Sequence, residues 1–184
     1  LSSGVDEQIL LPQQAKQKFQ DLNITMLGTV SKHKGQRYAI EVVKELLKLN
    51  LFSSVCISII GSGSDIDYIQ RKVNDAGLNQ HIKLLGRRDD AFELIARSHI
   101  FLHLSESEGL PLVILEAMSM GVPAIGFDVR GVNDIIRHGE NGYLAGFGDF
   151  RGIAQLLASF HGSNEKYSMM QKNARKIIEN EFSF

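Results

Sequence analysis

Two glutamates lie close together in the sequence beside a run of apolar residues. Glu108 precedes Gly109, and Glu116 lies within the apolar segment LPLVILEAMSMG. An unpaired carboxylate in apolar surroundings is unstable, so Glu116 needs a basic partner or a polar ligand. On these residues alone, an ion pair with Arg130 and a ligand contact remain alternatives. Two carboxylates can accept hydrogen bonds from the vicinal hydroxyls of a sugar or ribose, or form the acid pair of a glycoside hydrolase, and the spacing does not choose between these.

The turn between the two glutamates is suited to bind an anion. Pro111 is favourable at the first position of a helix, so Gly109 and Leu110 are predicted to lie just in front of the helix N-terminus. The free N–H groups there attract an anion or an oxygen-rich ligand, and glycine leaves room for it. Glu108 would also be stable beside the positive end of the helix, which gives it a purely structural alternative as a capping residue.

Two glycine-containing turns precede this motif. The segment GTVSKHKG runs from Gly28 to Gly35 and includes Lys34, so backbone N–H groups and an ammonium group could bind phosphate there, with a solvated basic turn as the alternative. The segment IIGSGSD contains Gly61 and Gly63, which would let a ligand approach the backbone closely, with a plain tight turn as the alternative. Neither segment has the spacing of a P-loop or the full dinucleotide-binding fingerprint.

The elements that position these motifs alternate between short apolar runs and longer amphipathic runs. This alternation predicts an α/β fold with a doubly wound, Rossmann-like parallel sheet flanked by helices. Strands are predicted at 24–28, 55–61, 82–86, 100–105 and 123–127, and helices at 36–50, 65–77, 89–97, 111–120, 131–137, 150–161 and 164–181. Such a sheet binds ligands at the carboxyl ends of its strands, which is where the three motifs fall.

The composition is that of one soluble globular domain. The 184 residues carry a formal net charge of -1 and are 43% hydrophobic, so nothing indicates a nucleic-acid partner, and phosphate recognition must be local. The single cysteine, Cys56, is predicted to be buried in the core, and a reducing, cytoplasmic setting is expected. No segment approaches the roughly 20 apolar residues needed to span a bilayer. His99 and His103 share a predicted strand and no helical face, so no zinc site is expected.

In order along the chain, these segments resemble the C-terminal, donor-binding domain of the retaining GT-B-fold glycosyltransferases of family 4. The matching segments are SSGVDEQILLP, MLGTVSKHKG, IIGSGSD, LLGRRDDAFELIARSHIFLHLS and ESEGLPLVILEAMSMGVPAIGFDVRGVNDIIRHGENGYL. The resemblance implies that residues 1–22 are a linker and lead-in from an N-terminal acceptor domain absent from this chain. It also implies that residues 23–184 form the nucleotide-sugar-binding domain.

The resemblance also implies roles for individual residues. Glu108 would lie against the donor sugar, Glu116 would bind the ribose hydroxyls, and Lys34 would neutralise the diphosphate as it leaves. Lys34 and Glu108 are the implied catalytic residues. The implied donor-binding residues are Gly28, Thr29, Lys34, Gly61, Gly63, Arg87, Glu108, Gly109, Leu110, Pro111, Leu112 and Glu116. A fixed ammonium group and a helix N-terminus can stabilise the leaving diphosphate, so neither a metal nor a cofactor is expected.

The implied donor is a nucleotide diphosphate sugar with UDP as the nucleotide, and the implied acceptor is a glycan or a lipid-linked acceptor in cell-surface polysaccharide synthesis. The full-length enzyme is expected in the cytoplasm, with peripheral contact to the inner face of the membrane, and the isolated fragment is expected to be inactive. One residue departs from the family pattern, because Thr29 stands where an arginine usually follows the first glycine of GTVSKHKG. A hydroxyl cannot replace a bidentate guanidinium on phosphate, which leaves a non-catalytic nucleotide-binding module as the alternative function.

Overall fold

The computed structural model describes residues 20–182. Its strands are β1 (Asp21–Leu27), β2 (Ser54–Ile60), β3 (Ile82–Gly86), β4 (Ile100–His103), β5 (Ala124–Phe127) and β6 (Gly142–Ala145). Its α-helices are α1 (Ala39–Leu49), α2 (Ile66–Asp75), α3 (Ala91–Ala96), α4 (Leu112–Ser119), α5 (Phe150–Ala158) and α6 (Asn164–Glu181). Two 3₁₀ turns, η2 (Lys32–Lys34) and η3 (Gln36–Tyr38), precede α1. The predicted α/β class is confirmed. Most of the predicted linker lies outside the described residues, and β1 begins within the range 1–22.

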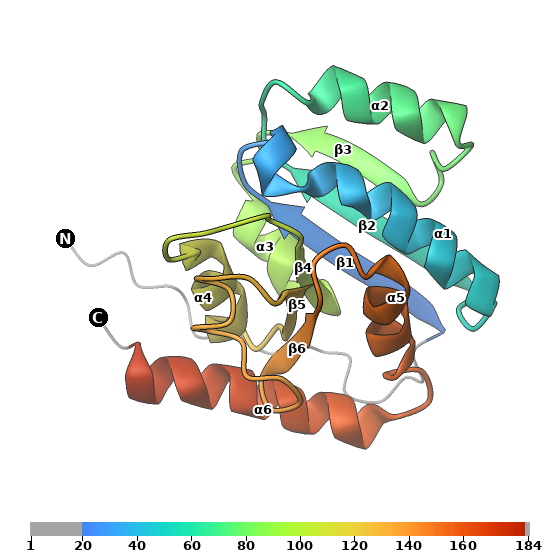
Figure 1. The fold of residues 1–184 in the computed structure, drawn as a ribbon. Helices are drawn as coiled ribbons and strands as arrows, with labels where there is room; N and C mark the ends of the chain where they lie inside the picture. Colours follow the sequence, from blue (N-terminus) through green and yellow to red (C-terminus); the bar gives the residue numbers. More distant parts are fainter. Residues whose placement is uncertain (1–19, 183–184) are drawn as a thin grey trace.

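The strands form one parallel sheet in the order β3-β2-β1-β4-β5-β6. From β1 the chain first adds β2 and β3 on one side and then crosses back to add β4, β5 and β6 on the other (Figure 1). The connections therefore leave β1 and β4 in opposite directions, which opens a crevice at the carboxyl ends of these neighbouring strands. The doubly wound prediction is confirmed, and this crevice is where a ligand site is expected.

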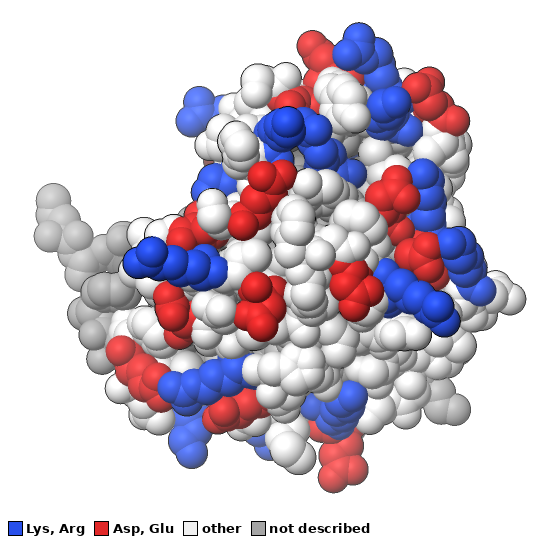
Figure 2. All heavy atoms as spheres, in the orientation of Figure 1, with Lys and Arg blue, Asp and Glu red and all other residues white. Residues whose placement is uncertain are grey.

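Charged side chains of both signs are interspersed over the face of the molecule in Figure 2. Because no single-sign field covers this face, an anion bound there must be held by individual groups. Within residues 20–182, none of the helices combines the length and the hydropathy needed to cross a bilayer.

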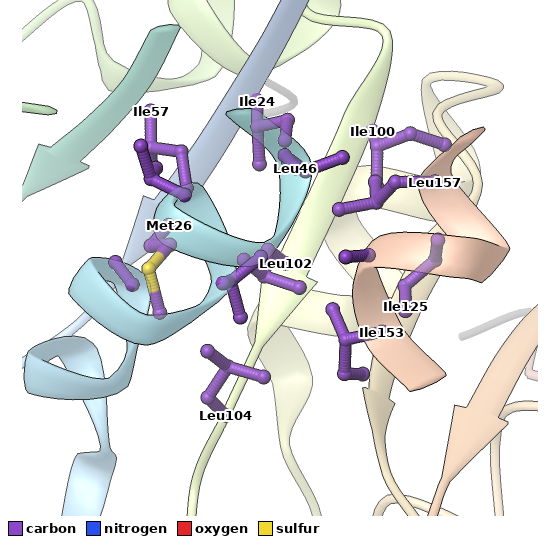
Figure 3. Packing of buried hydrophobic residues seen from close by; sticks show 14 of the residues in the cluster. Ile24, Met26, Leu46, Ile57, Ile100, Leu102, Leu104, Ile125, Ile153 and Leu157 are labelled. Atoms are coloured by element: carbon purple, nitrogen blue, oxygen red, sulfur yellow. The ribbon is translucent and has the colours of Figure 1, made fainter. Parts of the chain in front are cut away.

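The hydrophobic core lies in two clusters on the two faces of the sheet. Side chains alternate between the two faces along a strand, so Leu102 of β4 belongs to the larger cluster and its neighbour Phe101 to the smaller one. The larger cluster joins the sheet to α1, α2 and α5, and the smaller one joins it to α3 and α4. Figure 3 shows Leu46 of α1 and Leu157 of α5 packed towards the strands. Full burial of such a side chain contributes about 1.5–3 kcal/mol, so these contacts hold α1 and α5 against the sheet.

The helix predicted at 131–137 is not formed, and these residues make a series of turns. The Asn141 side chain takes the place of helical hydrogen bonds. Its Oδ1 accepts the N–H of Arg137 at 2.7 Å, and its Nδ2 donates to the carbonyl oxygen of Ile135 at 3.0 Å. The apolar spacing of this segment therefore reflects its burial against the sheet and not a helix.

The sequence predictions miss β6 and place Cys56 too deep. An added Cβ at Gly142 would lie 2.1 Å from the carbonyl oxygen of Ala124, so β6 needs a glycine at a position where most strands have a bulky residue.

Cys56 is half-buried, because side chains alternate along β2 and it points away from the face on which Val55 and Ile57 are buried.

Candidate active site

A pocket of about 270 Å³ lies at the carboxyl ends of β1 and β4. Its walls come from residues 26–29 at the end of β1, residues 102–104 at the end of β4, and residues 110–113 at the start of α4. Lys34, Gln36 and Glu108 complete the lining. The pocket therefore occupies the crevice that the strand order creates, and it brings the first and third sequence motifs together.

Lys34 and Glu108 form an ion pair in this pocket. Nζ of Lys34 lies 2.8 Å from Oε1 and 2.9 Å from Oε2 of Glu108. The Glu108 side chain is 9% exposed and that of Lys34 is 40% exposed, so the carboxylate is the more enclosed partner. A hydrogen bond from His103, followed by those from Lys34 and Ser105, lowers the pKa of Glu108 to about 2 against the opposing effect of burial. Glu108 is therefore ionised at neutral pH, and its oxygens only accept hydrogen bonds.

Contacts between two loops fix Lys34 opposite this carboxylate. Gly35 has a φ of +71°, and a Cβ there would lie 1.8 Å from the carbonyl oxygen of Leu104, so only glycine lets the loops approach this closely. The N–H of Glu106 donates to the carbonyl oxygen of His33 at 2.9 Å, and this hydrogen bond also joins the two loops. The loop that carries the carboxylate thus sets the position of the Lys34 backbone, within reach of the carboxylate.

Glu116 is half-buried, and its carboxylate has no hydrogen-bond or ion-pair partner within residues 20–182. The alternative of an ion pair with Arg130 is not formed, and the carbonyl oxygen of Arg130 instead accepts the N–H of Glu108 at 3.3 Å. Burial raises the pKa of Glu116. The residue lies one turn of α4 beyond Leu112, on the same side of the helix as this pocket residue. An unpaired, half-buried carboxylate beside a pocket is suited to a ligand that carries hydroxyl groups.

Gly61 and Gly63 pack against the loop that follows β1 and are not part of the pocket lining. A Cβ on Gly61 would lie 1.9 Å from the carbonyl oxygen of Gly28, and one on Gly63 would lie 2.1 Å from that of Val30. The space that a side chain would need is therefore filled by backbone, which explains glycine at both positions, and the close approach of a ligand to them stays a prediction. Contact with the base of a nucleotide stays a prediction for Gly61 and for Arg87, which is exposed after β3.

The pocket brings together part of the predicted donor-binding set. Its lining includes Gly28, Thr29, Lys34, Glu108, Leu110, Pro111 and Leu112, whereas Gly61, Gly63, Arg87, Gly109 and Glu116 lie outside the lining. Pro111 stands immediately before α4 and is not its first residue.

The sequence analysis missed two buried polar residues of the site. Nε2 of His103 lies 2.9 Å from Oε1 of Glu108. Gln36 is 3% exposed and donates from Nε2 to the carbonyl oxygen of Thr29 at 3.0 Å, while its Oε1 has no hydrogen-bond partner in the described part of the chain. His103 ends a strand that is otherwise apolar, and Gln36 follows the glycine of the basic turn. A polar residue at the carboxyl edge of a parallel sheet is the signal that could have indicated both.

Comparison with protein families shows to which family the chain belongs. The family model described as glycosyl transferases group 1 matches residues 10–177, a range that contains every residue lining the pocket. The chain belongs to this family. The matched region contains the Lys34–Glu108 ion pair and Glu116.

Curated relatives of this group 1 glycosyltransferase are longer than the chain. It is 29% identical over 182 residues to N-acetyl-alpha-D-glucosaminyl L-malate synthase of Bacillus anthracis, covering 97% of this chain and 48% of that protein. It is 30% identical over 162 residues to UDP-Gal:alpha-D-GlcNAc-diphosphoundecaprenol alpha-1,3-galactosyltransferase of Escherichia coli, covering 86% of this chain and 41% of that protein. The chain thus spans less than half the length of these two relatives.

Solved structures identify which half is present. The C-terminal domain of a group 1 family protein, LpcC, from Francisella tularensis superposes with a TM-score of 0.78 at 25% identity, covering 98% of this chain and 100% of that one. Anabaena HepE in complex with UDP-glucose superposes with a TM-score of 0.80 at 24% identity, covering 89% of this chain and 45% of that one. The fold is therefore that of a C-terminal domain in this family, as the sequence resemblance implies.

Proposed function

We propose that this chain is the donor-binding domain of a glycosyltransferase that uses a UDP-sugar. The observation that carries the proposal is the enclosed pair of Lys34 and Glu108 in a pocket at the switch point of the sheet. Lys34 supplies a positive charge for the diphosphate, Glu108 an acceptor for sugar hydroxyls, and Glu116 an acceptor for ribose hydroxyls. UDP as the nucleotide is supported by the 30% identical E. coli relative, whose name specifies UDP-Gal as its donor.

The chemistry follows from the charge that develops when the donor breaks. As the bond between the sugar and the phosphate cleaves, negative charge grows on the departing UDP and positive charge on the sugar. Lys34 and the positive N-terminal end of α4 stabilise the first charge, and the ionised Glu108 stabilises the second. Groups that are already fixed by the fold need little rearrangement at that moment, and no metal ion or cofactor enters the scheme.

The full-length enzyme, in this proposal, transfers the sugar with retention to a glycan or lipid-linked acceptor in cell-surface polysaccharide synthesis. The acceptor site comes from an N-terminal domain of the same polypeptide, so the domain alone binds the donor and does not transfer sugar. The enzyme works in the cytoplasm, at the inner face of the membrane when its acceptor is lipid-linked.

A second candidate is a nucleotide-binding module without transferase activity, and Thr29 is the observation that favours it. Thr29 lines the pocket and is exposed, but its hydroxyl brings no charge to a phosphate. Turnover of a UDP-sugar by the full-length enzyme separates the two candidates, because the module would bind UDP and leave the sugar attached. A hydrolase would instead release sugar to water without any nucleotide, and the position of Glu116 outside the lining that contains Glu108 argues against a shared acid pair.

The test is calorimetric titration of this chain with UDP, GDP and ADP. UDP is expected to bind, and Lys34→Gln is expected to weaken it by about tenfold or more, since hydrogen bonds between charged partners are among the stronger ones. Lys32→Gln is the matched control, because Lys32 lies in the same 3₁₀ turn but not in the pocket lining. If none of the three nucleotides binds, or if both lysine variants lose UDP equally, the assignment of the pocket is wrong.

A further inference from the structure

His103 approaches the pair of Lys34 and Glu108 from within the sheet. It is the last residue of β4, its side chain is 8% exposed, and its Nε2 lies 2.9 Å from Oε1 of Glu108. Because the ionised carboxylate only accepts, Nε2 carries the proton and donates. The imidazole also lies nearly parallel to the ring of Phe101, with centroids 6.3 Å apart and planes inclined by 22°. Burial and stacking together hold the donor in one direction.

Two donors of different mobility therefore share Oε1 of Glu108. Lys34 is 40% exposed and reaches the carboxylate with a flexible stem, so its ammonium group can turn to another anion. His103 is held in a strand and cannot follow it. A diphosphate that enters the pocket carries more negative charge than one carboxylate and draws the ammonium group to itself.

The departure of Lys34 would leave an enclosed charge behind. Glu108 loses the hydrogen bonds at 2.8 and 2.9 Å, and at 9% exposure water compensates it poorly. The hydrogen bonds from His103 and Ser105 stay, and the one from His103 has the larger effect on the carboxylate. Without the hydrogen bond from His103 the carboxylate would hold Lys34 more tightly, or would be less well fixed when the sugar arrives.

We infer that His103 is a positioning residue for the transfer reaction, which keeps the Glu108 carboxylate in place and hydrogen-bonded while Lys34 binds the diphosphate of the donor. This inference rests on the proposed function, because it names a third side chain of the same site. In this inference His103 acts through Glu108 and not through contact with the sugar or the phosphate. Its effect on nucleotide binding must therefore depend on the charge of Glu108.

The test is a double-mutant cycle on UDP affinity, measured by calorimetry with the wild type, His103→Leu, Glu108→Gln and the double variant. His103→Leu is expected to weaken UDP binding by about tenfold, since release of Lys34 then leaves the enclosed carboxylate without the hydrogen bond from His103. In the Glu108→Gln background the same replacement is expected to change the affinity by less than about twofold, because no charge remains to be compensated. His103→Gln keeps an N–H donor at a similar reach and is expected to restore most of the affinity.

His81→Leu is the matched control. His81 also makes one side-chain hydrogen bond, with Nδ1 at 2.9 Å from the carbonyl oxygen of Val55, but it lies outside the pocket, so its loss should leave UDP affinity unchanged. Thermal unfolding shows whether each variant is folded. If His103→Leu does not fold, His103→Phe takes its place in the cycle, since it keeps a ring beside Phe101 and has no donor.

The outcomes separate the inference from the function on which it rests. Equal weakening by the His103 replacement in both backgrounds, or no weakening when Glu108 is present, overturns the inference and leaves the proposed function standing. Failure of the wild type to bind UDP overturns the proposed function and the inference with it.

Discussion

Replacing Glu108 by glutamine should have opposite effects on the binding of UDP and on the transfer of sugar. In the free domain Glu108 occupies both hydrogen bonds of Lys34 at 2.8 and 2.9 Å, so it competes with the diphosphate for that ammonium group. Exposed ion pairs contribute about 0.2–1 kcal/mol, and removing one partner of a buried pair costs about 3–5 kcal/mol. With side chains 40% and 9% exposed, this pair lies between those limits. Releasing Lys34 should therefore strengthen UDP binding by about 1–2 kcal/mol, or about 5–30-fold.

The transfer reaction should respond in the other direction, because glutamine brings no negative charge to the sugar. In the full-length enzyme Glu108→Gln is expected to lower kcat by about 10²-fold or more, whereas UDP becomes a stronger inhibitor. Calorimetry with UDP and steady-state kinetics with the UDP-sugar measure the two effects. Glu106→Gln is the matched control, since Glu106 lies in the same loop but its partners are the hydroxyl of Tyr38 at 2.9 Å and Nδ1 of His33 at 3.2 Å. A folded Glu108→Gln variant with unchanged or weaker UDP binding would refute the competition between carboxylate and phosphate.

Four further predictions concern single residues. Thr29→Arg places a guanidinium at the pocket and should tighten UDP binding by about tenfold in calorimetry, and no gain or a loss would count against phosphate binding beside Thr29. Gly61→Ala should lower Tm by about 10 °C or more, because its Cβ would lie 1.9 Å from a carbonyl oxygen. Gly109→Ala is the control, because a Cβ there has open space and Tm should stay within about 2 °C of the wild type. Equal Tm values for the two variants would disprove the packing argument. Glu116→Gln removes a half-buried charge, so it should raise Tm by about 1–2 °C and weaken UDP binding about fivefold. Weaker UDP binding without a gain in Tm would mean that the Glu116 carboxylate has a stabilising partner in the free protein. The Glu108 carboxyl has a pKa of about 2 instead of 4.5, so its contribution to stability is complete above about pH 4.5 and is lost as the pH falls towards 2. Glu108→Gln should therefore have a lower Tm than the wild type at pH 7. A difference in Tm of the same size near pH 2 would contradict this.

Much of the fold is determined by local sequence patterns. The runs at 55–61, 82–86 and 123–127 are largely apolar and each contains a strand, of which β5 is buried along its whole length. The helix at 39–49 follows from the stripe of Val42, Val43 and Leu46, with exposed pairs such as Glu41 and Lys44 on the other side. Parallel strands and short connections then leave few possible strand orders, so the crevice at the carboxyl edge was predictable as well.

Patterns that depend on contacts distant in the sequence were not predictable. β6 was not predicted, because the need for glycine in this strand is explained only by the backbone of β5. Residues 131–137 have the apolar spacing of a helix, but side-chain hydrogen bonds from Asn141 hold their backbone in turns. Glycine at positions 61 and 63 is likewise explained by backbone that is distant in the sequence. A glycine indicates that a Cβ is excluded, and only the neighbouring loop shows what excludes it.

For the site, the sequence by itself determined which groups are present: a lysine in a glycine turn, a glutamate before a helix, and a second glutamate inside that helix. Only the tertiary structure decided their partners. It paired Lys34 with Glu108, left Glu116 without the arginine that the sequence offered, and added His103 to the carboxylate. The physical reason is that an ion pair depends on distance and enclosure in three dimensions, and Lys34 and Glu108 are 74 positions apart in the chain.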